Sequence, residues 1–445
     1  MSSSVPKPQL AVQYQPLTAL RPYPRNARTH SKHQIRQIAD SIRTFGFTNP
    51  VLVDRTNQMI AGHGRVEAAK LLSMDAVPTI TLEDLTEDQI RTYILADNKL
   101  AENAGWDKGI LTIEFQHLMT VQNMDFDVTV TGFEIPEIDI IIGDAISTPQ
   151  EPQEVAVPEF GQPAVSRLGD IWELGSHRIL CGSSLEETSY AALFRMKRAA
   201  AVFTDPPYNV RIDGHATGNG AIRHREFAMA SGEMGEDEFH GFLNTCVALL
   251  VRHTIANAVH YLCMDWRHIQ TLLAVGATNY EQLLNICVWV KDNGGMGSFY
   301  RSQHELIAVF RNSKRPHRNN VQLGKFGRNR TNVWQYPGVQ TLSKRSEEGN
   351  LLALHPTVKP IKMVADALLD CTNRGDIVLD AFLGSGTTLM AAGRIGRICY
   401  GIEIDPHFVD TAIRRWQQQT GDTAVHILTK KTFNETAVIR DTSNE

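Results

Sequence analysis

Closely spaced cysteines are missing from this sequence. Its six cysteines are spread singly between Cys181 and Cys399, and no two of them lie within four residues of each other. Zinc knuckles and fingers need close pairs of ligands, so this spacing argues against such a site, and we expect no metal. In a reducing compartment these thiols are expected to be small, buried core residues.

Long apolar runs and a large excess of one charge are missing as well. No run approaches the roughly 18 residues that a membrane span needs, and the first residues lack the apolar core of a signal peptide. The chain has 44 Lys+Arg against 49 Asp+Glu, a formal net charge of −5, so contact with nucleic acid would need a local basic patch. We therefore expect a cytoplasmic protein with no membrane partner.

The chain has 445 residues, which predicts two or three domains, and its 42% hydrophobic and 21% charged residues are typical of a globular protein. Residues 147–163 contain four prolines and no basic residue, a composition typical of an extended linker. This linker predicts an N-terminal domain over residues 1–146 and a C-terminal domain over residues 164–445.

Apolar periodicity predicts a different fold class on each side of the linker. In the N-terminal domain, a helix between Ser31 as N-cap and Gly46 as C-cap precedes short strands at Val51–Val53 and Met59–Ala61, which predicts a small α+β domain. In the C-terminal domain, short apolar strands alternate with helix-length segments. This alternation predicts an α/β fold with a mainly parallel sheet covered on both faces.

A glycine-rich turn in the C-terminal domain is the strongest sign of a cofactor site. A predicted strand at Ile377–Asp380 and a predicted helix at Thr387–Arg397 flank the turn, and its glycines let the backbone pass close to a ligand. Glu403 stands 19 residues beyond Gly384, a spacing at which an acid can bond ribose hydroxyls. Leu389 occupies a position where a dinucleotide fingerprint needs Gly or Ala, so the pattern predicts a nucleoside without a pyrophosphate.

A second motif, Asp205-Pro206-Pro207-Tyr208, directly follows the apolar strand Ala200–Phe203. The two prolines fix the backbone at the end of the strand and present carbonyl acceptors. An amino group on a planar heterocycle could donate to Asp205 and to the Pro206 carbonyl while its ring stacks on Tyr208. The alternative is a proline turn that only closes the strand.

Together, DPPY and DAFLGSGTT (residues 380–388) resemble the motif pair of amino-group DNA methyltransferases, in the order of their β class. HPTVKP at residues 355–360 is similar to the HPTxKP motif of this family, which approaches the methionine end of the cofactor. The resemblance covers about residues 165–420 and implies a Rossmann-like methyltransferase domain that binds S-adenosylmethionine. It implies that the catalytic residues are Asp205, Pro206, Pro207 and Tyr208. It implies that the cofactor-binding residues are Asp380, Phe382, Gly384, Ser385, Gly386, Thr387, Thr388, Glu403, Thr357 and Lys359.

A basic stretch lies between the two motifs. Residues 311–350 hold nine Lys+Arg against two acids, with Phe326, Trp334 and Tyr336 among them. The family places its target-recognition region between these motif-bearing strands. We therefore expect a recognition region around residues 311–354 that contacts double-stranded DNA, rather than only a solvated face. The predicted DNA-binding residues are Lys314, Arg315, Arg318, Lys325, Arg328 and Arg330.

The N-terminal domain has a resemblance of its own. LRPYPRNARTHSKHQIRQIADSIRTFGFTNPVLVD followed by IAGHGRVEAAKLL resembles the N-terminal domain of ParB-type partition proteins, over roughly residues 14–105. In that family a GxxR-type loop can meet phosphates, and Gly62, His63, Gly64 and Arg65 occupy it here. Gly64 stands where partition proteins often carry one of a pair of arginines, and a structural role explains His63 as well as a functional one.

These motifs predict a site-specific DNA methyltransferase that transfers a methyl group from S-adenosylmethionine to the N6 amine of adenine. One alternative is cytosine N4 methylation, which uses the same amine chemistry, although serine more often stands first in the motif of that group. Another is a DNA-binding partition or regulatory protein with an inactive methylase domain. A homodimer and a separate restriction enzyme are compatible with the prediction as partners besides DNA.

Overall fold

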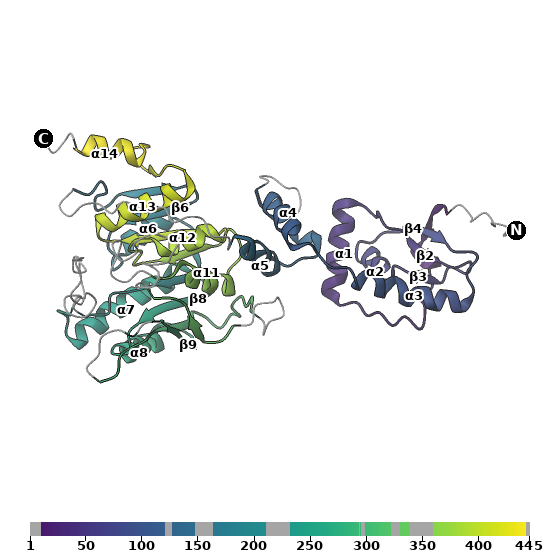
Figure 1. The fold of residues 1–445 in the computed structure, drawn as a ribbon, viewed down its shortest axis with the longest axis horizontal. Helices are drawn as coiled ribbons and strands as arrows, with labels where there is room; N and C mark the ends of the chain where they lie inside the picture. Colours follow the sequence, from purple (N-terminus) through teal and green to yellow (C-terminus); the bar gives the residue numbers. More distant parts are fainter. Residues whose placement is uncertain are drawn as a thin grey trace. The chain divides into compact units, whose positions relative to one another are not determined.

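The computed structural model describes residues 10–120, 127–146, 163–210, 232–292, 294, 299–321, 330–338 and 359–441. The chain consists of two compact units, Met1–Ser147 and Thr148–Glu445, and each is described by itself (Figure 1). The predicted linker lies outside the described residues apart from Pro163. In the described ranges, no helix has the length and apolar character that crossing a membrane requires.

The first unit contains a four-stranded sheet in the order β1–β4–β2–β3 (Figure 1). β2 and β4 are parallel, whereas β1 pairs with β4 and β3 with β2 in antiparallel fashion. The elements are β1 Val12–Pro16, η1 Leu17–Ala19, α1 Lys32–Phe45, β2 Val51–Val53, β3 Met59–Ala61, α2 His63–Leu71, β4 Ala76–Thr81, α3 Glu87–Glu102, α4 Lys108–Thr120, η2 Val128–Thr131 and α5 Ile135–Ile146. This mixture of helices and strands is the predicted α+β class.

Short-range signals determine where α1 begins and ends. Ser31 caps the helix as predicted, because its hydroxyl oxygen accepts a hydrogen bond from the Gln34 N–H at 3.1 Å. Gly46 ends the helix with a φ of 80°, a conformation that glycine adopts without a steric penalty. The strands predicted at Val51–Val53 and Met59–Ala61 are β2 and β3.

The helices α4 and α5 of the first unit form a small cluster of their own with η2. Phe115, Val128, Ile138 and Ile142 are buried together there, and none of the four is more than 6% exposed. This separate helical core was not expected within the single ParB-like domain predicted over residues 1–146.

The second unit contains a ten-stranded sheet in the order β11–β9–β10–β8–β7–β12–β13–β6–β5–β14. Its middle strands β8, β7, β12, β13 and β6 are mutually parallel, as predicted. The flanks add antiparallel pairs, because β10 is antiparallel to β8 and β9, and β5 is antiparallel to β6 and β14. The two-residue connection between β5 and β6 explains one of these pairs, since only a parallel pair needs a long crossover.

The elements of the second unit alternate between strand and helix. They are β5 Ile171–Leu174, β6 His177–Cys181, α6 Glu187–Phe194, β7 Ala199–Thr204, α7 Glu236–Arg252, β8 Thr254–Met264, α8 Ile269–Asn279, β9 Gln282–Val290, β10 His304–Arg311, β11 Val333–Gln335, α11 Ile361–Cys371, β12 Ile377–Asp380, α12 Thr387–Arg394, β13 Ile398–Glu403, α13 Pro406–Thr420, β14 Val425–His426 and α14 Phe433–Asp441.

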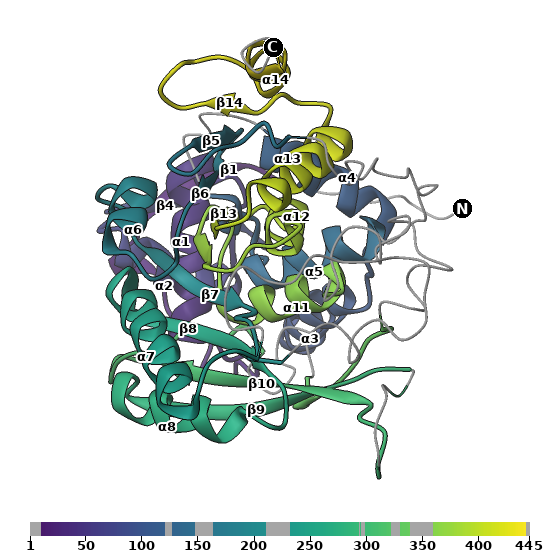
Figure 2. The same cartoon turned by 90° about the vertical axis from the view of Figure 1, so that its left-hand side faces the viewer.

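Helices cover both faces of the large sheet, which makes a three-layer α/β unit (Figure 2). α6, α7 and α8 bury residues such as Tyr190, Leu243 and Leu272 against one face. α11, α12 and α13 bury residues such as Leu368 and Leu389 against the other. The predicted Rossmann-like arrangement is confirmed.

Helix α12 is shorter than predicted. It ends at Arg394, whereas the apolar pattern predicted a helix as far as Arg397. Gly396 has a φ of 69°, which is left-handed backbone that cannot continue the helix. Arg397 is 1% exposed and donates to the Thr372 carbonyl at 2.8 Å, so it belongs to the turn that leads into β13.

All six cysteines are buried and unbridged, as predicted, and all lie in the second unit. Burial raises the pKa of the Cys181 and Cys246 thiols to about 12. These residues therefore serve as small core side chains.

Candidate active site

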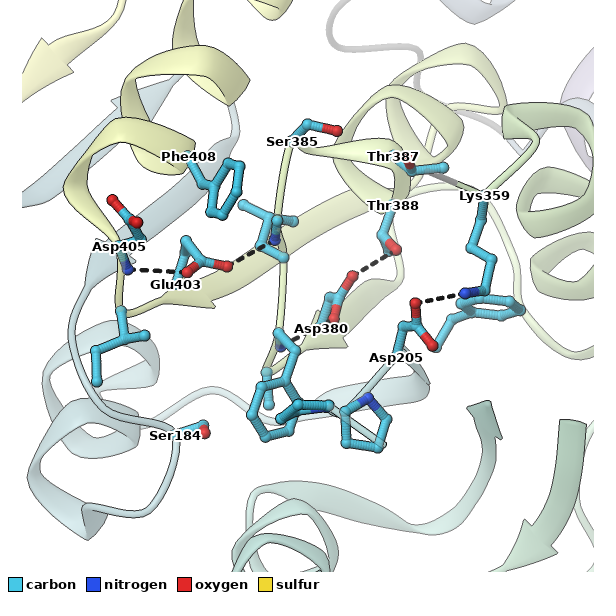
Figure 3. A pocket seen from close by; sticks show the side chains of 18 of the residues that line it. Ser184, Asp205, Lys359, Asp380, Ser385, Thr387, Thr388, Glu403, Asp405 and Phe408 are labelled. Atoms are coloured by element: carbon cyan, nitrogen blue, oxygen red, sulfur yellow. Dashed lines mark hydrogen bonds and ion pairs between the residues drawn. The ribbon is translucent and has the colours of Figure 1, made fainter. Parts of the chain in front are cut away.

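A pocket opens at the carboxyl ends of β7, β12 and β13, which are neighbours in the parallel part of the sheet. The chain proceeds from β7 to β8 on one side and from β12 to β13 on the other, so the strand order reverses at the pocket. Open α/β sheets bind ligands at such a reversal. Asp205, Asp380 and Glu403, each at the end of one of these strands, line the pocket (Figure 3).

Asp380, the last residue of β12, is held by two hydroxyl groups. Its carboxylate accepts hydrogen bonds from the Thr388 hydroxyl at 2.7 Å (Figure 3) and from the Thr204 hydroxyl at 2.8 Å. The Phe382 N–H donates to it at 3.1 Å. Burial raises the pKa of Asp380 to about 6, because neutral donors offset only part of the cost of desolvation. Asp380 thus joins β12 to β7 and to the start of α12.

The glycine loop between β12 and α12 needs its glycines. Gly384 has a φ of 53° and Gly386 a φ of 88°, both in the left-handed region. A Cβ at Gly386 would lie 2.9 Å from the Cβ of Ala412 on α13. The loop therefore combines a special backbone conformation with close packing, and it brings Gly384 and Ser385 to the pocket.

Glu403, the last residue of β13, faces this loop. Its carboxylate accepts from the Gly384 N–H at 2.7 Å and from the Asp405 N–H at 2.9 Å (Figure 3). Burial raises the pKa of Glu403 to about 7. Each carboxylate oxygen keeps a lone pair beyond its bond to the backbone, so Glu403 can accept hydrogen bonds from a ligand as well.

The predicted catalytic motif follows β7 and meets Lys359, the second residue before α11. Asp205 pairs with the Lys359 ammonium and accepts a hydrogen bond from the Tyr208 hydroxyl at 2.5 Å (Figure 3). The side chains of Lys359 and Asp205 are only 5% and 19% exposed. Burial and the nearby Glu305 raise the pKa of Asp205, although Lys359 partly offsets them. The Lys359 ammonium and the Tyr208 hydroxyl therefore orient the Asp205 carboxylate.

Glu305 on β10 lies behind this group and outside the described lining of the pocket. Its carboxylate binds the Lys359 ammonium at 3.0 Å and pairs with Lys291 after β9. It also lies 3.2 Å from the Tyr208 hydroxyl, as the more distant of the two acceptors around that group's single hydrogen. Burial alone would raise the pKa of Glu305, but the two ammonium groups outweigh burial and lower it to about 2. The sequence analysis missed Glu305 and Lys291. The only signal was a charged residue at the pocket-side end of each apolar strand.

The structure brings most of the predicted site residues to one pocket. Those that line it are Asp205, Pro206, Pro207, Tyr208, Lys359, Asp380, Phe382, Gly384, Ser385, Thr387, Thr388 and Glu403. Gly386 acts as the N-cap of α12 instead. Thr357 lies outside the described residues. The ammonium of Lys359, predicted to bind the cofactor, is paired with the two carboxylates described above.

The predicted DNA-binding residues fall into different environments. Lys314, Arg315 and Arg318 follow β10 and are exposed. Lys325 and Arg328 lie outside the described residues. Within the described residues of the basic region, exposed cations therefore follow β10.

The protein binds Arg330 more extensively than it binds these residues, of which Arg318 pairs with Asp376 at 3.1 Å. The Arg330 side chain is 18% exposed and pairs with Asp370 at 2.8 Å. It also donates to the Tyr336 hydroxyl at 3.0 Å and lies over the ring of Trp334, 5.1 Å from the centroid. Trp334 on β11 is 5% exposed and belongs to the core. Arg330 and Trp334 of the predicted recognition region are therefore packed against the rest of the fold.

Three family profiles match separate stretches of the chain. A DNA methylase profile matches residues 199–414, which contain both predicted motifs. A ParB N-terminal domain profile matches residues 2–99, and a ParB-methyltransferase HTH domain profile matches residues 109–168. Residues 199–414 therefore form a DNA methylase domain of the N6/N4 family. This DNA methylase carries ParB-type domains ahead of its catalytic unit, and the HTH profile covers the α4–η2–α5 cluster.

Individual relatives resemble different parts of this DNA methylase. The ParB-like nuclease domain-containing protein YnaK of Escherichia coli (strain K12) is 54% identical over 81 residues, which are 18% of this chain and 93% of that protein. The Type II methyltransferase M2.MboI of Moraxella bovis is 27% identical over 226 residues, 49% of this chain and 81% of that protein. The crystal structure of the M1.HpyAVI–SAM complex is 21% identical and covers 53% of this chain and 97% of that one, with a TM-score of 0.39.

The DNA methylase domain implies S-adenosylmethionine as cofactor, and the donor set of the pocket fits it. Asp380, Glu403 and Asp405 line the pocket, together with the rings of Phe382 and Phe408 (Figure 3). Carboxylates suit ribose hydroxyls and a cationic sulfonium, whereas they would repel a pyrophosphate. The aromatic rings offer faces to a purine.

Proposed function

We propose that this DNA methylase transfers a methyl group from S-adenosylmethionine to the N6 amine of adenine, at a specific site in double-stranded DNA. One observation carries the proposal: the motif of residues 205–208 and the loop of residues 384–388 line the same pocket. Aspartate as the first residue of the motif favours adenine over cytosine in this family.

The loop and the end of β13 would hold the cofactor. In this proposal Glu403 accepts hydrogen bonds from the ribose hydroxyls, and Phe382 and Phe408 flank the purine. When bound, S-adenosylmethionine supplies an electrophilic methyl group on its sulfonium.

Asp205 and Tyr208 would hold the target base. The amine of a base inside a duplex is out of reach, so the nucleotide must be extruded into the pocket. The ring of Tyr208 then offers a stacking face, while Asp205 and the Pro206 carbonyl accept the two amine hydrogens. These bonds favour a pyramidal nitrogen with an available lone pair.

The amine must lose one proton as its nitrogen forms the bond to the methyl carbon. Asp205 is the acceptor in this proposal. The raised pKa of Asp205, which burial causes, makes its carboxylate a better base than a solvated one. The chemistry therefore needs Asp205 ionised and aimed at the amine before transfer.

DNA would be held by the exposed cations after β10. We assign phosphate contacts to Lys314 and Arg315, and to Arg318, whose ion pair with Asp376 would open to a phosphate. Contacts by Lys325 and Arg328, which lie outside the described residues, stay predictions from the sequence. In contrast, Arg330 supports the recognition region through its bonds to the protein. A homodimer and a separate restriction enzyme remain predictions from the sequence.

Expression in a host without DNA modification tests this function. Mass spectrometry of nucleosides from that host's DNA should detect N6-methyladenine with the wild-type protein and none with Asp205→Ala. N4-methylcytosine in its place would overturn the choice of base but keep the amine chemistry. No methylated amine at all, with S-adenosylmethionine bound, would favour the regulatory alternative.

A further inference from the structure

The carboxylate of Glu305 has no part in the proposed chemistry, yet it is buried among groups that have one. Its side chain is 14% exposed and lies outside the described lining of the pocket. A buried carboxylate costs several kcal/mol in desolvation and is weak evidence for a role in stability alone. The position of Glu305 therefore calls for another explanation.

Three contacts connect Glu305 to the catalytic motif. One oxygen binds the Lys359 ammonium at 3.0 Å and lies 3.2 Å from the Tyr208 hydroxyl, and the other pairs with Lys291. Lys359 and Tyr208 are also the two donors that bind Asp205. Glu305 thus shares both of the side chains that orient Asp205.

The charges of this cluster balance in pairs. Two carboxylates, Asp205 and Glu305, face two ammonium groups, Lys359 and Lys291. Because Lys291 neutralises Glu305 from the far side, the charge of Lys359 remains available to Asp205. Without Lys291, two carboxylates would share one cation.

We propose that Glu305 is a positioning residue for methyl transfer, which holds Lys359 and Tyr208 so that Asp205 stays aimed at the target amine. Lys291 is its partner in this role. The proposal rests on the proposed function, because it assigns Glu305 a part in the same reaction. Neither Glu305 nor Lys291 touches the reacting atoms in this scheme.

The charge of each partner should shift the ionisation of Asp205 in a known direction. Removing the negative charge of Glu305 should lower the pKa of Asp205, and removing the positive charge of Lys291 should raise it through an unbalanced Glu305. The groups that face or electrostatically influence this cluster from the packed elements are Tyr208, Cys263, Glu305, Lys359, Lys291 and Asp380.

The test is the pH dependence of the maximal methylation rate for wild type, Glu305→Gln and Lys291→Met. The substrates are S-adenosylmethionine and duplex DNA from a host without modification, both at saturation. The acid limb should move down by about one pH unit in Glu305→Gln and up in Lys291→Met. The rate at the plateau should fall by about tenfold to 100-fold in Glu305→Gln, because a misplaced group costs that much. Glu173→Gln is the matched control, since Glu173 forms a partly buried ion pair with Arg178 away from the pocket.

The direction of the two shifts separates positioning from simple support of the fold. A structural role alone would lower the rate of both variants and leave the acid limb unmoved, which would overturn the inference. If Glu305→Gln does not fold, Lys291→Met carries the test by its upward shift. A wild-type protein that methylates no duplex DNA would contradict the proposed function itself. An active wild type, with variants whose acid limb lies at the wild-type pH, would contradict only the inference.

Discussion

The two ends of the pocket hold their carboxylates in different ways. At the cofactor end, formed by β12 and β13, neutral donors bond Asp380 and Glu403. At the target end, beyond β7, Asp205 faces an ammonium group. The acids of the cofactor end have pKa values that burial raises to about 6 and about 7. At the target end, two lysines outweigh burial at Glu305 and lower its pKa to about 2. At Asp205 a single lysine only partly offsets burial and the charge of Glu305, so the pKa of Asp205 is raised.

This difference shows how one pocket can serve two tasks. Hydroxyl and backbone donors orient a carboxylate without fixing its charge, which is sufficient for bonding neutral ribose hydroxyls. A lysine favours the charged form, which a proton acceptor needs before it acts. Changes at the two ends should therefore affect different steps.

The largest expected effect is at the target end. Asp205→Ala should lower the rate of methyl transfer by about 100- to 10,000-fold or abolish it, because the amine loses its acceptor. Cofactor affinity, measured by calorimetry, should stay nearly unchanged, since the carboxylate serves the base. An Asp205→Ala enzyme that transfers methyl groups at the wild-type rate would disprove the mechanism.

The matching change at the cofactor end should affect binding instead. Glu403→Ala should weaken S-adenosylmethionine binding by about 10- to 100-fold, because a charge-assisted hydrogen bond contributes about 1.5–3 kcal/mol. The rate with saturating cofactor should fall much less. Unchanged affinity in a folded Glu403→Ala protein would show that another carboxylate binds the ribose.

The acids of the cofactor end should also make stability depend on pH. Folding raises the pKa of Glu403 from 4.5 to about 7, so the folded protein binds more protons than the unfolded chain between these values. Stability without cofactor should therefore fall as the pH rises from about 4.5 to about 7, by at most about 3 kcal/mol from this residue. Urea denaturation at several pH values should show a flatter dependence for Glu403→Gln, and an unaltered slope would contradict this assignment.

The smallest expected effect concerns the glycine loop. Gly386→Ala should destabilise the protein more than Gly421→Ala, although both glycines have left-handed backbone. A Cβ at Gly421 meets open space, whereas one at Gly386 lies 2.9 Å from Ala412. We expect about 1 kcal/mol for Gly421→Ala and about 1–3 kcal/mol more for Gly386→Ala. Equal shifts in thermal unfolding would mean that packing against α13 contributes nothing.

Local features were predictable from the sequence because their causes are local. The caps Ser31 and Gly46, the strand Ile377–Asp380 and the N-cap Asp405 all depend on residues within a few positions. The end of α12 was missed because the apolar pattern continues past Arg394, while a glycine bend stops the helix.

The target end was predictable only in part. The sequence places Asp205 and Tyr208 after a strand, but the pairing with Lys359 spans 154 residues. The role of the Tyr208 hydroxyl was also hidden. On the sequence alone Tyr208→Phe should be a mild change, yet the hydroxyl contacts both Asp205 and Glu305. Such contacts depend on the order of strands in the sheet, and short apolar segments do not reveal that order.

The buried cysteines have a practical consequence for studying the two units. All six belong to the second unit, and desolvation leaves so little thiolate that reagents should modify them only when the core opens. The rate at which a thiol reagent labels these cysteines in the native protein would then measure how often the catalytic unit opens. A cysteine introduced at the exposed Leu95 of the first unit would be the fast-reacting thiol and could carry a fluorophore on that unit alone.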